Sequence, residues 1–287
     1  MSRIAFVNGA YVPFAHASVH VEDRGLQFAD SIYEGIAVAN GRCIDEEPHW
    51  DRLERSLREL RQAMPMDRTA LSWHAQETVR RNRVRHGVAY VQITRGVARR
   101  DHPFPRADLL QTVIITARRF DPARAKASGE GGVAVKTMPD IRWGRRDIKT
   151  TALIANVLAK QAAREAGAYE AWLVDEQGFV TEGASTNAWI VDADGVLTTR
   201  ALSHALLPGC TRKTVLGLAA DRQMRVAERS FSVADTKAAR EAFITSAGNY
   251  VTPVISIDGQ PVGDGKPGPV TQALRRAYIE EFVEIDA

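Results

Sequence analysis

The sequence of 287 residues contains only two cysteines, Cys43 and Cys210, which lie far apart. This pair predicts neither a disulfide framework nor a zinc site, because both need several suitably spaced ligands. The chain also lacks the run of about 18 apolar residues that a membrane helix requires, and its N-terminal segment lacks the apolar centre of a signal peptide. We therefore expect a protein of the reducing cytoplasm that does not bind membranes.

The chain also lacks a strong charge of either sign. Its 38 basic and 35 acidic residues give a net charge of +3, and the basic residues are scattered along the sequence. Nucleic acid is therefore not an expected partner. The content of 45% hydrophobic and 25% charged residues is typical of a soluble globular protein.

Several motifs of common enzymes are missing. We find no phosphate-binding Walker loop, no G-x-G-x-x-G after a predicted strand, no H-E-x-x-H, no C-x-x-C and no G-x-S-x-G. Each of these absences removes one class of nucleotide, metal, redox or hydrolase site. The residue types that remain for chemistry are lysine, glutamate and arginine.

The order of expected elements predicts an α+β fold with two domains. The Asn-Gly pairs at 8–9 and 40–41 predict tight hairpins in a small N-terminal α/β domain, residues 1–120. Residues 121–132 are polar, small and rich in glycine, which indicates an interdomain linker. Residues 133–287 then form a larger domain, rich in antiparallel strands.

Lysine occurs at only seven positions, and Lys149 in "RRDIKTTALIAN" precedes a mostly apolar helix expected over 151–166. Burial and the neighbouring Arg145 and Arg146 would both disfavour the protonated amine. The neutral amine is a nucleophile that can form a Schiff base with a carbonyl. The alternative is a surface lysine that begins a helix, and the residues alone leave both interpretations open.

A carboxylate in "FVTEGASTNAWIV" is a second candidate. Glu182 ends an expected strand, and the small hydroxyl residues Ser185 and Thr186 follow in a turn. A carboxylate in this setting could pair with a ring nitrogen and keep a pyridinium protonated. An ordinary exposed turn is the alternative.

Groups suited to a phosphate occur at three further places. Gly209 and Thr211 in "LLPGCTR" lie where a helix is expected to begin, and a helix N-terminus offers free N–H groups to anions. The alternative there is a simple cap by Thr211. The turn 246–248 in "FITSAGNYV" adds a hydroxyl and a glycine, and Arg52 could point inward from an amphipathic helix.

Lysine for an imine, carboxylate for a pyridinium and a helix start with arginine for a phosphate together describe a pyridoxal phosphate site. The ordered motifs "DRGLQFADSIYEGI", "DRL", "TRG", "DIK", "VTEGASTN", "PGCTR" and "ITSAGNYVTPV" make nearly the whole chain similar to fold-type IV pyridoxal phosphate aminotransferases. Within that group it resembles the D-amino acid aminotransferases. The resemblance implies a larger C-terminal domain that is a β-rich pseudo-barrel with helices and carries the Schiff-base lysine.

The resemblance assigns a role to each candidate. Lys149 would form the Schiff base with pyridoxal 5′-phosphate and carry protons, Glu182 would pair with the pyridine nitrogen, and no metal is expected. The other residues implied in cofactor binding are Arg52, Ser185, Thr186, Leu207, Gly209, Cys210, Thr211, Ser246 and Ala247. Relatives often carry threonine at Ala247, which here offers only a backbone N–H, and Leu26 replaces an aromatic residue often seen in D-specific relatives.

The same resemblance implies how substrate binds. Arg100 and His102 in "TRGVARRDHPFP" match an Arg-x-His pair that binds the substrate α-carboxylate together with a tyrosine, here Tyr33. Ala247 and Gly248 would complete the substrate contacts. Because this loop comes from the partner subunit in relatives, the resemblance implies a homodimer with its active site at the subunit interface. Without the resemblance, the loop would be interpreted as a solvated tip.

The expected reaction is transamination between D-amino acids, such as D-alanine or D-glutamate, and a 2-oxo acid, either 2-oxoglutarate or pyruvate. A branched-chain L-amino acid aminotransferase is the main alternative; "YEGI" favours it, and the Arg100-x-His102 pair opposes it. An R-selective amine transaminase and an aminodeoxychorismate lyase are further alternatives of the same fold. A non-catalytic binding protein is disfavoured because Lys149 and Glu182 are both present.

Overall fold

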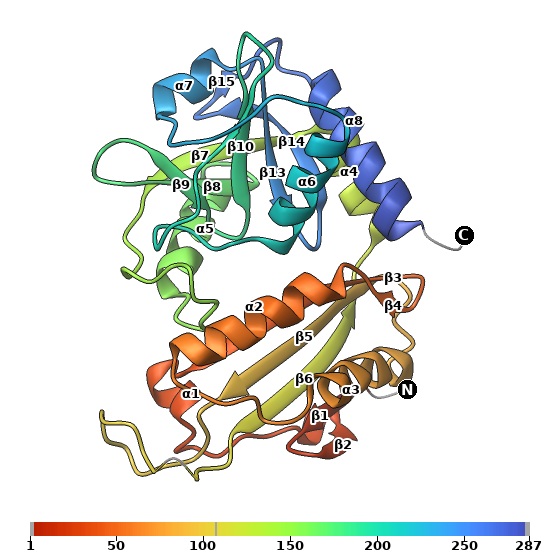
Figure 1. Cartoon of the computed structure of the whole chain (residues 1–287), viewed down its shortest axis with the longest axis vertical. Coiled ribbons are helices and arrows are strands. Elements are labelled where there is room, and N and C mark those ends of the chain that lie inside the picture. The colour runs from red at the N-terminus through yellow and green to blue at the C-terminus, as the bar shows by residue number, and fades with distance from the viewer. Residues whose placement is uncertain (1–2, 107, 285–287) are drawn as a thin grey trace. The chain divides into compact units, whose positions relative to one another are not determined.

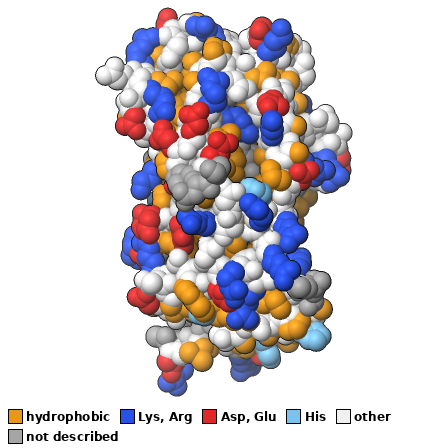
Figure 2. Space-filling model, turned by 90° about the vertical axis from the view of Figure 1, so that its right-hand side faces the viewer, with side chains coloured by type: hydrophobic (Ala, Val, Ile, Leu, Met, Phe, Trp, Pro, Cys, Tyr) orange, Lys and Arg blue, Asp and Glu red, His pale blue; other side chains and the backbone are white. Residues whose placement is uncertain are grey.

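The computed structural model describes residues 3–106 and 108–284, which group into two compact units. Unit 1 contains the chain up to Asp121 and the segment Ile148–Ala152, and unit 2 contains Pro122–Asp147 and the chain from Leu153 onward. Among the described helices, none is both long and apolar enough to cross a bilayer. On the face drawn in Figure 2, Lys and Arg side chains lie among Asp and Glu side chains.

Unit 1 is built on a six-stranded antiparallel sheet of order β2-β1-β6-β5-β3-β4 (Figure 1). Its strands are β1 (Ile4–Val7), β2 (Ala10–Pro13), β3 (Ser31–Ala39), β4 (Arg42–Cys43), β5 (Gly87–Thr94) and β6 (Thr112–Arg119). Asn8 and Gly9 have φ of 46° and 90°, and Asn40 and Gly41 have φ of 50° and 85°. These left-handed pairs close the β1–β2 and β3–β4 hairpins, so both predicted turns are confirmed.

Two helices, α2 (Glu46–Glu59) and α3 (Arg68–Arg81), cover one face of this sheet. Unit 1 also contains the short helices η1 (Phe14–His16) and α1 (Arg24–Phe28). The apolar faces of α2 and α3 bury Leu53 and Leu71 in one cluster with Ile32 and Ile36 of β3. Alternate residues of β3 therefore face this core, and the residues between them point to the other side of the sheet.

Unit 2 has a nine-stranded mixed sheet of order β12-β11-β10-β13-β14-β7-β8-β9, with β15 paired to β14. The strands are β7 (Val133–Pro139), β8 (Glu170–Val174), β9 (Val180–Gly183), β10 (Asn187–Val191), β11 (Leu197–Thr199), β12 (Val226–Glu228), β13 (Glu241–Ser246), β14 (Tyr250–Ile257) and β15 (Gln260–Pro261). The helices are α4 (Pro122–Gly131), α5 (Ile154–Glu165), α6 (Cys210–Asp221), α7 (Val233–Ala238), α8 (Pro269–Tyr278) and the π-turn η2 (Ile279–Val283). Edge strand β9 contacts β10, so the sheet curls back on itself.

The predicted linker at 121–132 is instead the helix α4, which belongs to unit 2. The glycines of this segment suggested a linker, but Gly129 is needed for helix packing. The buried guanidinium of Arg275 occupies the space that a Cβ at Gly129 would need, about 2.1 Å away. Arg275 also donates to the carbonyl of Ala125 at 2.8 Å, which ties α4 to α8.

The helix expected over 151–166 begins at Ile154 and ends at Glu165. It buries the small residues Ala159 and Ala163. Its larger apolar side chains are exposed in the chain, with 72% of Ile154, 57% of Val157 and 55% of Leu158 accessible. The large apolar side chains of this helix are therefore not buried within the single chain, although their apolar character suggested burial.

The segment that carries Lys149 belongs to unit 1, whereas the sequence placed it in the larger C-terminal domain. Residues 149–151 pair with the first residues of β3, through an antiparallel bridge between Ile32 and Thr150. The backbone N–H of Tyr33 donates to the carbonyl of Lys149 at 3.0 Å, and that of Thr151 donates to Ser31 at 3.2 Å. This long-range pairing moves the lysine segment to the edge of the N-terminal sheet.

Candidate active site

Lys149 lies beside Tyr33 in unit 1. Strand alternation places both side chains on the face of β3 opposite to α2 and α3. The Nζ of Lys149 is 4.1 Å from the centre of the Tyr33 ring, within cation–π range. Two residue pairs along, the hydroxyls of Ser31 and Thr151 form a hydrogen bond that fixes the register. The structure thus brings together the predicted Schiff-base lysine and the predicted substrate tyrosine.

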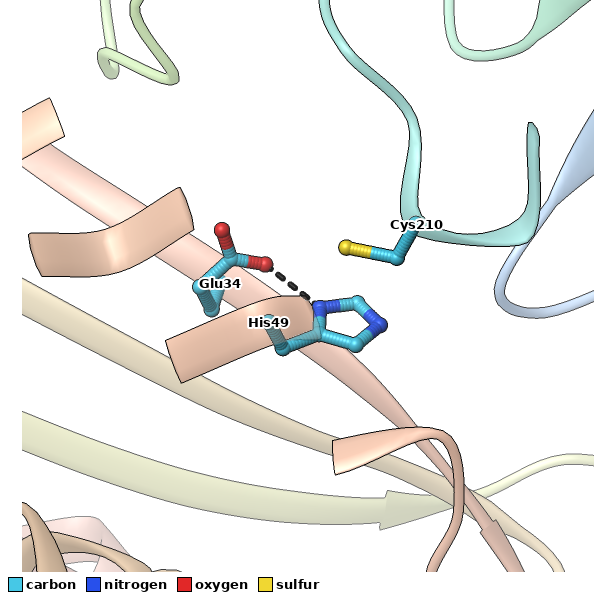
Figure 3. Close-up of side chains that lie close together, drawn as sticks. All are labelled: Glu34, His49 and Cys210. Atoms are coloured by element: carbon cyan, nitrogen blue, oxygen red, sulfur yellow. Dashed lines mark hydrogen bonds and ion pairs between the residues drawn. The ribbon is translucent and has the colours of Figure 1, made fainter. Parts of the chain in front are cut away.

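The other face of β3 carries a buried charge cluster. Glu34 is fully buried, and Arg52 on α2 donates to both of its oxygens, Nε at 2.8 Å and Nη2 at 2.7 Å. His49 Nδ1 lies 2.6 Å from the same carboxylate (Figure 3). Burial alone would raise the pKa of Glu34, but Arg52 and His49 lower it to about 2. Arg52, predicted to bind phosphate, is therefore oriented by a carboxylate that the sequence analysis missed.

Arg100 and His102 lie in the exposed loop after β5. The guanidinium of Arg100 is 5.3 Å from the centre of the Phe28 ring, and the rings of Phe28 and His102 are 5.5 Å apart. The two predicted carboxylate ligands therefore share one aromatic neighbour on α1.

In unit 2, Glu182 ends strand β9 and is 4% exposed. Its Oε1 accepts from Arg142 at 2.5 Å and from the backbone N–H of Leu207 at 3.1 Å, and its Oε2 accepts from Asn187 at 3.1 Å. Burial raises the pKa of Glu182, and the charge and hydrogen bond of Arg142 oppose that rise. A second cation close to this carboxylate would further favour its ionised form.

Arg142 is the main residue of this site that the sequence did not reveal. It bonds bidentately with the buried Asp140, Nε at 2.9 Å and Nη2 at 2.8 Å, while Nη1 reaches Glu182. Thr181 donates to Asp140 at 2.7 Å. The available signal was the pair Asp140 and Arg142, which alternates with the apolar Ile141 and Trp143, but arginine is too common here to be singled out.

The two arginines before Lys149 both have carboxylate partners in unit 2. Arg145 donates to Asp147 at 2.9 and 3.0 Å, and Arg146 Nε lies 3.5 Å from Asp140. The guanidinium of each arginine therefore lies beside a carboxylate of its own unit.

The start of α6 has the geometry expected of an anion site. Gly209 is its N-cap with extended backbone, and no side chain caps the helix. A Cβ at Gly209 would meet Asn187 Oδ1 at 2.0 Å, so glycine is required there. Asn187 also donates to the carbonyl of Leu207 at 3.0 Å, which couples the Glu182 carboxylate to the helix start. Cys210 and Thr211 form the buried first turn.

Two turns carry the remaining candidates. Ser185 donates to the buried Glu170 at 2.6 Å, whereas the buried Oγ1 of Thr186 has no hydrogen-bond partner in the described part of the chain. The turn of the β13–β14 hairpin holds Ala247 and Gly248, directly after Ser246. An unpartnered buried hydroxyl is costly, so Thr186 is consistent with a site that receives a polar ligand.

These features fit a pyridoxal phosphate group. The buried Glu182 carboxylate is a group that would pair with a ring nitrogen, the uncapped N-terminus of α6 suits a phosphate, and the Thr186 hydroxyl has no partner among the described residues.

Comparison with known proteins gives consistent matches. Residues 31–257 match the model of the family described as amino-transferase class IV. The chain is 37% identical over 280 residues to D-alanine aminotransferase of Staphylococcus haemolyticus, covering 97% of both chains. A solved branched-chain amino acid aminotransferase of Escherichia coli superposes with a TM-score of 0.90 at 26% identity, covering 99% of this chain and 95% of that one. The branched-chain aminotransferase of the archaeon Thermoproteus uzoniensis, solved with norvaline, gives a TM-score of 0.84 at 29% identity, covering 97% and 94%. These neighbours confirm the predicted α+β fold.

Proposed function

The chain belongs to the class IV aminotransferase family, and we propose that it transfers the amino group of D-amino acids to 2-oxo acids with pyridoxal 5′-phosphate as cofactor. The predicted family and enzyme class are thereby confirmed. The observation that carries the D-specific proposal is the 37% identity to a D-alanine aminotransferase over 97% of both chains. The Arg100-x-His102 pair, the predicted carboxylate ligand, supports it further.

When bound, the cofactor supplies a carbonyl for the amine and an electron sink for the charge at the substrate Cα. Lys149 would hold the cofactor through its Nζ and, once released by the substrate amine, would move the Cα proton as a neutral amine. The Glu182 carboxylate would face the ring nitrogen and favour its protonated form. Burial raises the pKa of this carboxyl group, and the charge and hydrogen bond of Arg142 oppose that rise and favour the ionised form. Leu207 would lie against the ring, and Ser185 and Thr186 beside it.

The phosphate is proposed to bind at the start of α6. The N–H groups that follow Gly209 have no side-chain cap, so an anion can accept from Cys210 and Thr211. Arg52, Ser246 and Ala247 are the further proposed ligands. Because Ala247 has no hydroxyl, it can contribute only its backbone N–H.

The substrate carboxylate is proposed to bind Tyr33, Arg100 and His102, with Ala247 and Gly248 completing the contacts. Arg forms bidentate pairs with carboxylates, and tyrosine and histidine add hydrogen bonds. We propose that the loop acts in a homodimer with its active site at the subunit interface.

Exposed apolar residues support a dimer. The outer face of α5 exposes Ile154, Val157 and Leu158 together, whereas soluble chains usually bury neighbouring side chains of this size. We place the dimer in the cytoplasm.

The test is a paired assay of D-alanine and L-leucine with 2-oxoglutarate. Turnover of D-alanine with little of L-leucine supports the proposal, and the reverse establishes the branched-chain alternative, which is the activity named for the solved structural neighbours. Lys149→Ala should abolish turnover, the visible cofactor band and covalent trapping by borohydride. The exposed Lys126→Ala is the matched control and should change none of them.

A further inference from the structure

The motif Asp23–Asp30 contributes to the family resemblance, yet none of its residues is among the proposed cofactor or substrate contacts. It forms α1, whose N-cap Asp23 accepts from the N–H of Gly25 at 2.8 Å and from the hydroxyl of Thr94 at 2.9 Å. A Cβ at Gly25 would lie 2.5 Å from Thr94 Cγ2, so only glycine allows this approach. The helix is thereby fixed at the end of β5, where the loop with Arg100 and His102 begins.

Arg24 holds the main chain of that loop. Its side chain is 4% exposed and donates from Nη1 to the carbonyl of Asp101 at 2.6 Å and from Nη2 to that of His102 at 3.3 Å. Its Nε donates to Asp30 at 2.8 Å, and Arg95 donates to the same oxygen at 2.7 Å. Because the carboxylate orients the guanidinium, the two carbonyls at the loop tip are held in place.

Phe28 holds the side chains of the loop. The guanidiniums of Arg24 and Arg100 lie 4.8 and 5.3 Å from its ring centre, within cation–π range. The ring of His102 is 5.5 Å away and tilted by 46°. Arg100 and His102 are otherwise exposed, so this ring restricts two side chains that would sample many rotamers.

We propose that Arg24 and Phe28 are positioning residues for the substrate carboxylate. Arg24 fixes the main chain of the loop, and Phe28 fixes the Arg100 and His102 side chains before substrate arrives. Side chains that are already ordered bind a substrate more tightly, because they lose less conformational entropy on binding. The inference rests on the proposed role of Arg100 and His102 in binding the carboxylate.

The experiment compares holoenzyme with Phe28→Leu, which keeps apolar volume and removes the ring. We expect the KM for D-alanine to rise about five- to tenfold with kcat nearly unchanged, as for the loss of ground-state binding. Trypsin should also cut faster after Arg99 and Arg100. The matched control is Phe14→Leu, which removes another partly exposed ring under an arginine, Arg3 at 3.8 Å, and should alter neither readout.

Two further variants separate the possible failures. Arg24→Lys keeps the charge beside Asp30 but loses the fork that spans the two carbonyls, so it should raise KM in the same direction. If Arg100→Ala raises KM while Phe28→Leu and Arg24→Lys leave it unchanged, the positioning role is overturned and the proposed function stands. If Arg100→Ala itself leaves KM unchanged, the carboxylate role of the loop fails and the positioning proposal fails with it.

Discussion

The buried Glu34 carboxylate should make a large and pH-dependent contribution to stability. Burial raises its pKa, but Arg52 and His49 together lower it from 4.5 to about 2. Each unit of pKa shift corresponds to about 1.4 kcal/mol, so ionised Glu34 contributes about 3 kcal/mol to the free energy of unfolding. Because the folded-state pKa is the lower one, this contribution is complete above pH 4.5 and is lost as the pH falls towards 2.

Glu34→Gln keeps the shape of the side chain and removes its charge. At pH 7 we expect its urea unfolding, followed by circular dichroism, to give a free energy about 3 kcal/mol below that of the parent, since Arg52 is left buried without its counter-charge. The difference should shrink between pH 5 and pH 3. A variant as stable as the parent at pH 7, or a difference that persists undiminished at pH 3, would refute the reasoning.

Glu77→Gln is the matched control. Hydrogen bonds from Arg80 and Arg81 also lower the pKa of Glu77 to about 2. This cluster lies at the surface, where Arg80 is 70% exposed and water screens the charges. Its removal should therefore change the free energy of unfolding far less than Glu34→Gln.

Two further predictions concern the lysine and the carboxylate. Arg142→Met removes the cation that Asp140 and Glu182 share. The pKa of Glu182 should therefore rise further, and kcat should fall at least about tenfold. A pH titration of the visible cofactor band checks this, and Arg222→Met, which breaks a surface ion pair, is the control. Thr151→Val removes the hydrogen bond between the Thr151 and Ser31 hydroxyls. It should lower the free energy of unfolding by about 1 kcal/mol and slow borohydride trapping at Lys149. An unchanged trapping rate would show that this hydrogen bond does not fix the register.

Local signals in the sequence predicted much of the fold. The Asn-Gly pairs predicted both hairpins, and Gly209 with Thr211 predicted the start of α6, because turn and cap chemistry depend on adjacent residues. The same locality explains the failures. Gly129 suggested a linker because its partner Arg275 is far away in sequence, and Lys149 was placed in the wrong unit because its pairing with β3 is equally remote.

The candidate site shows the same division. Residues that match a family motif, such as Lys149 and Glu182, could be named from the sequence. The charged partners that orient such groups could not, because Arg142 lies 40 positions from Glu182 and Arg52 lies 18 from Glu34. Arginine is abundant in this chain, so only the three-dimensional contacts distinguish these two from solvated neighbours.

The pairing of residues 149–151 with β3 has a consequence for the biogenesis of the enzyme. Until the ribosome has released residue 152, the first residues of β3 present unpaired main-chain groups, and an open strand edge invites association with other chains. Unit 1 is also not continuous in sequence, because a fragment that ends at Asp121 lacks the segment Ile148–Ala152 that pairs with β3. A split version of this protein that is divided after Asp121 should therefore not give a stably folded N-terminal fragment.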